Sequence, residues 1–245
     1  MSSSEGLLYL DHSYPSPEEN LACDHALFEA CEDGECDEVL RFWHTDAYFV
    51  VGGYTNRIST EVYIEACEET GTPVLRRFSG GGTVVQGPGC FNYSLILRPA
   101  RRPDCETISG TNILVMKRHR DAMKTLLGGA VEFAGISDLT LRSLKFSGNA
   151  QRRGRDCVLF HGTFLLTMDL SVISRLLPPP SKSPDYRMNR SHAEFLTNIN
   201  VEKSTMKDAL LTCWNAHTEL QADLGGRIQH LVRTRYANPA WIFRY

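Results

Sequence analysis

Long apolar runs and an export signal are both absent from this sequence. The most apolar segments, residues 48–53, 91–97 and 158–168, are shorter than the roughly 20 apolar residues that a membrane-spanning helix needs. Residues 1–6 contain no basic stretch followed by an apolar run, so no secretory signal is visible. We therefore expect a cytoplasmic protein that has no membrane partner.

An excess of charge of either sign is also missing. The 245 residues carry 26 Lys and Arg against 29 Asp and Glu, which gives a net charge of −3. This balance provides no general attraction to nucleic acid phosphates, so we expect no nucleic acid partner and only local basic sites. A composition that is 42% hydrophobic and 22% charged also excludes a disordered chain.

None of the eight cysteines belongs to a Cys-x-x-Cys pair. Cys31 and Cys36 are separated by four residues, and no cluster of cysteine and histidine follows them, so a structural zinc site is not predicted. Because no export signal is visible, the cysteines are interpreted as reduced thiols rather than as disulfides.

Predicted helices and strands are intermixed along the chain. Ser16-Pro17-Glu18-Glu19 is typical of a helix start, with a capping serine, a proline at the first position and the glutamate of a capping box. Further helical segments are expected at residues 61–70, 109–127, 170–177, 205–222 and 227–235. Strands are expected at residues 39–43, 48–51, 73–78, 83–86, 91–97, 131–134, 139–141 and 157–168. The absence of a regular strand–helix–strand order favours a mixed α/β sheet with flanking helices, in one domain spanning residues 1–245.

Three segments carry chemistry. Residues 76–85 join two arginines to three successive glycines, whose amide groups can bind an anion. Residues 145–151 begin with Lys145 at a strand end and lead into a basic loop at residues 152–155, which suits a carboxylate or a phosphate. His161 follows in an apolar strand. Taken singly, these segments are equally consistent with a hairpin turn, a solvated lysine and a core histidine.

Together, the three segments resemble the lipoate–protein ligase A family, which shares its catalytic fold with biotin–protein ligases. The resemblance depends on the Arg-Arg-x-Ser-Gly-Gly-Gly-x-Val run at residues 76–85 and the Lys-x-Ser-Gly-x-Ala run at residues 145–151. It also depends on His-Gly-Thr at residues 161–163, with a weaker match at Ser137-Asp138-Leu139. It extends over about residues 7–198 and implies the biotin/lipoate protein ligase catalytic-domain fold.

The resemblance implies an enzyme that activates lipoate or octanoate with ATP and Mg²⁺. The acyl adenylate then passes its acyl group to a lysine of a lipoyl carrier domain or an H-protein-like acceptor. By motif match, Lys145 is the catalytic residue and contacts both substrates. The residues implied for the nucleotide are Arg77, Gly82, Thr83, Val84, Val85 and Asp138, of which Asp138 is also the implied metal ligand. The residues implied for lipoate are Arg76, Ser79, Gly80, Gly81, His161 and Gly162.

Two departures from the family pattern bear on this hypothesis. Gln86-Gly87-Pro88-Gly89 stands where many relatives have His-Asp-x-Gly, so the role of that acidic residue is not transferred. The sequence ends at Tyr245 without the small C-terminal accessory domain of full-length ligases. Either a separate accessory subunit supports adenylation, or this subfamily works without one.

Two other functions stay open at this point. An octanoyl or lipoyl transferase would use a cysteine thioester and no ATP, and Cys157, four residues before His161, is its nearest candidate thiol. A lipoate-binding protein without catalysis would keep the pocket alone, although it would have no need of Lys145 and the two arginines.

Overall fold

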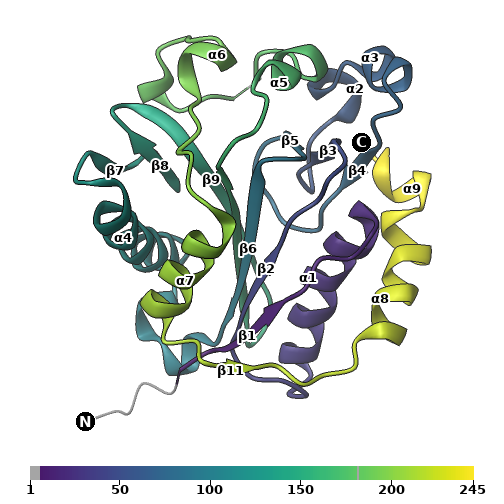
Figure 1. Ribbon diagram of the computed structural model, residues 1–245. Coiled ribbons are helices and arrows are strands. Elements are labelled where there is room, and N and C mark those ends of the chain that lie inside the picture. The colour runs from purple at the N-terminus through teal and green to yellow at the C-terminus, as the bar shows by residue number, and fades with distance from the viewer. Residues whose placement is uncertain (1–5, 181) are drawn as a thin grey trace.

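The computed structural model, which describes residues 6–180 and 182–245, is built around a mixed sheet of eight strands (Figure 1). The strand order is β11-β1-β2-β6-β10-β9-β8-β7. Their bounds are β1 Leu8–Asp11, β2 Val39–Trp43, β6 Cys90–Leu97, β7 Val131–Ala134, β8 Asp138–Leu141, β9 Leu144–Arg153, β10 Val158–Leu165 and β11 Thr218–Glu219. Strand β1 pairs in parallel with β2 and β11, whereas the other pairs are antiparallel. The predicted mixed α/β fold is thus confirmed.

Helices cover both faces of this sheet, as Figure 1 shows. One face packs against α1 (Pro17–Glu32), α8 (Gly225–Leu231), the π-helix η4 (Val232–Tyr236) and α9 (Pro239–Ile242). The other face packs against α4 (Ile108–Leu127) and α7 (Lys203–Trp214). The predicted start of α1 is confirmed, since the Ser16 side chain accepts from the Glu19 amide and Glu19 completes the capping box. Two apolar cores therefore fix the sheet from opposite sides.

A second sheet of three strands lies at one end of the main sheet (Figure 1). It consists of β4 (Val74–Arg76), β3 (Phe49–Gly52) and β5 (Val84–Gln86), with β3 in the centre. The short segments of this end are α2 Ile58–Glu61, α3 Ile64–Glu69, α5 Ser171–Leu176, η3 Asp185–Arg187 and α6 His192–Phe195, while η1 (Pro99–Arg101) and η2 (Pro103–Cys105) precede α4. The glycine-rich run connects β4 to β5, so this small sheet holds both of its ends.

The structure corrects several predicted elements. Strand β1 was missed because it is short and only half-buried. Helix α7 ends at Trp214, well before residue 222, because Asn215 adopts a left-handed backbone (φ 52°). The first half of the predicted basic loop at 152–155 is strand, since β9 runs to Arg153 and pairs with β10 from Ser147 to Arg153. The middle of β9 was not predicted as a strand because its small polar residues do not alternate with apolar ones.

Candidate active site

A cavity of about 290 Å³ lies where the two sheets meet. Most of its lining comes from three parts of the chain: the glycine-rich run before β5, the middle of β9 and β10, and the segment of residues 177–196. Helices α1 and α5 and strands β2, β3 and β6 contribute the rest. The volume is near the lower limit of typical ligand pockets, roughly 300 Å³. All three segments that the sequence singled out therefore meet in one place.

Arg77 determines the shape of the glycine-rich run. Its Nη2 donates to the carbonyl oxygens of Gly80 (2.6 Å) and Gly82 (2.7 Å), and its Nη1 donates to that of Val51 (3.3 Å). Burial, with Arg76 nearby, lowers the pKa of Arg77 to about 10. Among the described residues, Arg77 has no carboxylate partner, so an anion in the cavity would gain from this buried cation.

The backbone of the same run is arranged to receive an anion. The amide groups of residues 80–82 donate no hydrogen bond to any other described residue. Gly81 has a φ of +88°, and a Cβ there would lie 2.8 Å from Nη2 of Arg77. A Cβ on Gly53 would lie 2.1 Å from the Gly81 carbonyl oxygen, so two glycines are needed for this close approach. The free amides form a candidate anion-binding nest.

Lys145 lies on the β9 wall of the cavity and is held in place by its neighbours. Its Nζ is 2.8 Å from Oδ1 of Asp138, whose Oδ2 accepts a 2.7 Å hydrogen bond from the Tyr186 hydroxyl. A Cβ on Gly148 would lie 2.8 Å from Nζ, so this glycine makes room for the ammonium. The Thr197 amide donates to the carbonyl oxygen of Lys145 (2.9 Å), which anchors the strand start.

His161 links the glycine-rich run to β10. Its Nε2 lies 2.6 Å from Oγ of Ser79. Burial, with a smaller contribution from Arg77, lowers the pKa of His161 to about 3, so the ring is neutral at physiological pH. A Cβ on Gly162 would lie 1.6 Å from Oδ1 of Asn149, so this glycine gives space to a side chain of the cavity wall.

The family model of the lipoyl protein ligase A/B catalytic domain matches residues 16–212. The chain belongs to this family. The match includes Arg77, Lys145 and His161, the three side chains that the cavity brings together.

The relatives of this chain divide into proteins named as lipoate-protein ligases and proteins named as octanoyltransferases. A candidate lipoate-protein ligase A of Aeropyrum pernix is 29% identical and covers 92% of the chain and 88% of its own length. Octanoyltransferase LipM of Brevibacillus brevis is 25% identical and covers 94% of the chain and 95% of its own length. The family is therefore shared by a ligase group and a transferase group.

Solved structures show the same fold. A bi-partite lipoate protein ligase of Thermoplasma acidophilum, solved with its E2 lipoyl domain, superposes with a TM-score of 0.81 at 21% identity, and covers 98% of this chain and 96% of that chain. A lipoate-protein ligase A bound with ATP gives a TM-score of 0.81 at 20% identity, with 98% and 99% covered. The chain thus has the catalytic-domain fold of lipoate protein ligases.

Arg76 does not reach the cavity of this ligase A/B-family chain, which corrects its predicted contact with lipoate. The side chain is fully buried and points in the opposite direction from its neighbour. It donates to the carbonyl oxygens of Gly53 (2.7 Å), Asn56 (2.9 Å) and Ile242 (2.8 Å). Arg76 therefore ties helix α9 to the turn after β3.

The remaining predicted residues divide into two groups. Those on the cavity surface are Gly81, Gly82, Thr83, Val84, Val85 and Gly162. Ser79 and Gly80 lie behind that surface and act on it through His161 and Arg77. Among the apolar residues close to these segments, Val84 lines the cavity, whereas Val50 and Phe160 belong to apolar cores.

Asp138 does not fit its predicted role as a metal ligand. Both carboxylate oxygens are occupied by Lys145 and Tyr186, and the residue is absent from the cavity surface. No group of three or more His, Cys, Asp or Glu that could hold a metal occurs in residues 6–180 and 182–245. In the described residues Asp138 is thus a partner of Lys145 and Tyr186, and its predicted role as a metal ligand finds no support in these contacts.

Cys157 lies outside the cavity. It is 2% exposed and packs with α1 and β10 in an apolar core. A hydrogen bond to Cys31, together with burial, raises the pKa of its thiol far above the usual range. No cysteine of the described chain lines the cavity, so the predicted thioester role of Cys157 finds no support in its position.

The segment of residues 178–196 is the part of the site that sequence reasoning missed. It contributes apolar side chains and Arg187, which is 7% exposed and whose pKa is lowered by burial. Arg187 donates to the carbonyl oxygen of Arg190 (2.9 Å) and stacks on Phe195, and no carboxylate of a described residue pairs with it. The signals available in the sequence are the prolines of residues 178–184 and the Phe-Leu-Thr-Asn run at residues 195–198 that follows them.

Proposed function

We propose that this protein is an ATP-dependent lipoate–protein ligase. It would join the carboxylate of lipoate or octanoate to AMP and then pass the acyl group to a lysine of a carrier domain. The observation that carries the proposal is one cavity that holds Lys145 opposite an amide-lined glycine run and contains no thiol among the described residues. Such a cavity suits two anionic substrates and offers no nucleophile for a thioester.

The chemistry assigns a role to each cation. In the first step, a lipoate carboxylate oxygen attacks the α-phosphorus of ATP, and pyrophosphate leaves. Both reactants are anions, so Arg77, Lys145 and the amides of residues 80–82 would lower the barrier by compensating their charge. In the second step, the carrier amine attacks the acyl carbon and AMP leaves, with the ammonium of Lys145 stabilising the charge on the departing phosphate.

Asp138 and Tyr186 act one step away from the reacting atoms. Asp138 fixes the position of the Lys145 ammonium, and Tyr186 fixes the carboxylate in turn. This arrangement keeps the ammonium pointed at one spot without a direct contact between the carboxylate and the substrates. We infer that both are positioning residues, and that the neutral His161 shapes the acyl side of the cavity through Ser79.

The acceptor would be a lipoyl carrier domain or an H-protein-like protein. Support comes from the Thermoplasma structure, in which a ligase of the same fold was solved with its E2 lipoyl domain. The same structure is described as bi-partite, which supports a separate accessory subunit for this chain as well.

Lipoate-dependent exchange of labelled pyrophosphate into ATP tests the proposal. We expect exchange with purified protein, alone or with an accessory subunit, and loss of exchange in Lys145→Ala. Cys157→Ser is the matched control and should retain exchange, because Cys157 lies outside the cavity.

Acyl transfer without ATP is the second candidate, and the match to octanoyltransferase LipM favours it. Octanoyl transfer from a carrier thioester, without ATP and abolished by Cys157→Ser, would replace the ligase proposal with this one. Tight lipoate binding with neither reaction would indicate a binding protein.

A further inference from the structure

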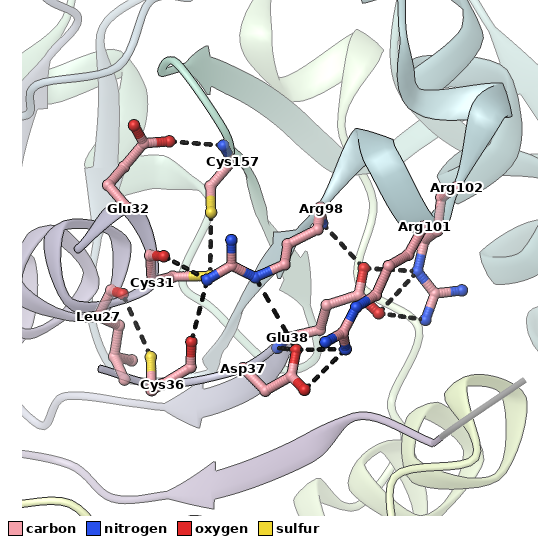
Figure 2. A network of polar contacts seen from close by, with 10 residues as sticks. All are labelled: Leu27, Cys31, Glu32, Cys36, Asp37, Glu38, Arg98, Arg101, Arg102 and Cys157. Carbon is pink, nitrogen blue, oxygen red and sulfur yellow. Dashed lines mark hydrogen bonds and ion pairs between the residues drawn. The ribbon is translucent and has the colours of Figure 1, made fainter. Parts of the chain in front are cut away.

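Three thiols meet at the far end of helix α1, outside the candidate active site (Figure 2). Cys31 is in the last turn of α1, Cys36 is in the loop that follows, and Cys157 directly precedes β10. The Sγ atoms of Cys31 and Cys157 are 3.0 Å apart. A disulfide bond is about 2.05 Å long, so the two sulfurs need to approach by only about 1 Å to become bonded.

Hydrogen bonds to the surrounding backbone hold these three cysteines in place. Glu32 accepts hydrogen bonds from the amides of Asp156 (3.0 Å) and Cys157 (2.5 Å), which fixes the β9–β10 turn on the end of α1. The Arg98 guanidinium donates to the carbonyl oxygens of Cys31 and Cys36 and so holds the loop against the helix (Figure 2). The close contact of the sulfurs is therefore built into the packing.

The three thiols differ in accessibility and acidity. Cys36 is half-buried, its Sγ donates to the carbonyl oxygen of Leu27 at 3.8 Å, and the neighbouring Cys31 thiol lowers its pKa despite burial (Figure 2). Cys31 and Cys157 are almost fully buried. The thiol of Cys157 lowers the pKa of Cys31, but the interaction of Cys31 with Cys36 and its burial raise it, and the result is a pKa of about 12. An oxidant from solvent would therefore meet Cys36 first.

We propose that these residues form a peroxide-reactive thiol site whose end product is a Cys31–Cys157 disulfide. The Cys36 thiolate attacks hydrogen peroxide, the O–O bond breaks, and Cys36 becomes a sulfenic acid as hydroxide leaves. Cys31 sulfur attacks the Cys36 sulfur and displaces water, which forms a Cys31–Cys36 disulfide. Cys157 then attacks the Cys31 sulfur and releases the Cys36 thiol. In total, two thiols and one peroxide give one disulfide and two waters.

This disulfide would join α1 to the start of β10 and close a loop of more than a hundred residues. Cross-links across long loops reduce the entropy of the unfolded chain, so the oxidised protein should be the more stable form. The active-site wall on β10 begins at His161, beyond the cross-link, so oxidation is expected to change stability rather than catalysis.

Titration with hydrogen peroxide, followed by mass spectrometry of unreduced peptides, tests the proposal on the full chain. One equivalent should give a linked Cys31–Cys157 peptide with Cys36 as a free thiol. The Tm measured without reductant should rise by about 5–15 °C, and dithiothreitol should reverse the rise. Oxidation of Cys36 to a sulfinic acid without a linked peptide would overturn the proposal.

Two serine variants sharpen the test. Cys36→Ser should form the linked peptide at least tenfold more slowly, because it lacks the thiol that peroxide meets first. Cys213→Ser is the matched control, since Cys213 is also half-buried but burial raises the pKa of its thiol to about 12. This control should react as the wild type does. Equal rates in Cys36→Ser and wild type would remove Cys36 from the sequence of steps.

Discussion

Two of the walls of the candidate active site, at residues 77–86 and 178–196, are built in different ways. On the wall formed by residues 77–86, Arg77 donates hydrogen bonds to the carbonyl oxygens of three different residues and so defines the backbone. On the wall formed by residues 178–196, Arg187 donates to one carbonyl oxygen, that of Arg190, and stacks on a ring. Arg77 is thus part of the framework of its wall, whereas Arg187 is more available to a ligand.

Lys145→Ala should have the largest effect, because Lys145, on the β9 wall of the cavity, serves both substrates in the proposed mechanism. We expect adenylation to fall by about 10²–10³-fold, equivalent to about 2.7–4 kcal/mol of lost transition-state stabilisation. Pyrophosphate exchange measures the rate, and circular dichroism checks the fold. Unchanged exchange in a folded variant would show that Lys145 does not contribute to adenylation.

Arg77→Lys and Arg187→Lys compare the walls directly. Lysine keeps the charge but cannot bind several carbonyl oxygens at once. Arg77→Lys should therefore lower the free energy of unfolding by about 2–3 kcal/mol, and Arg187→Lys by less than about 1 kcal/mol. Urea denaturation measures both values. Similar losses in the two variants would contradict the distinction between framework and ligand-facing arginines.

Tyr186→Phe tests how the 178–196 wall acts on the β9 wall. The change removes the hydroxyl that donates to Asp138, so the carboxylate that positions Lys145 becomes more mobile. We expect kcat for exchange to fall about fivefold, roughly 1 kcal/mol, with KM for lipoate little changed. A change in KM alone would place Tyr186 in substrate binding instead.

Acid pH should affect stability through His161, with no effect at neutral pH. Burial lowers the pKa of His161 to about 3 in the folded state, whereas the unfolded chain takes up the proton near pH 6.5. Between these two values the unfolded state binds more protons, so stability is lost as the pH falls below about 6.5. The loss is about 1.4 kcal/mol per pH unit for this group. His161→Gln should reduce the slope of unfolding free energy against pH, and an unchanged slope would mean that the ring is solvated.

The sequence predicted the glycine-rich run, Lys145 and His161 because each is a short motif with a local cause. It placed both Arg76 and Arg77 in the cavity, whereas the two side chains point in opposite directions and Arg76 bonds to α9 instead. The ion pair of Asp138 with Lys145 was also missed. It requires the pairing of β8 with β9, which contains an irregularity between Leu139 and Thr140.

The position of the wall at residues 178–180 and 182–196 was not predicted, because its described residues form only the short elements η3 and α6. Its position depends on contacts distant in sequence, such as the hydrogen bond from Tyr186 to Asp138 and the bridge between Lys145 and Leu196. Apolar periodicity identifies helices and strands, but it carries no information about where such a connection lies.

Arg76 has a practical consequence for handling the protein. Its guanidinium joins the carbonyl oxygens of Trp241 and Ile242 to the turn that supports the glycine-rich run. Deleting residues 239–245, or fusing a bulky affinity tag to them, would disturb the bonds that join α9 to the turn after β3. Purification handles are therefore better attached at the opposite terminus.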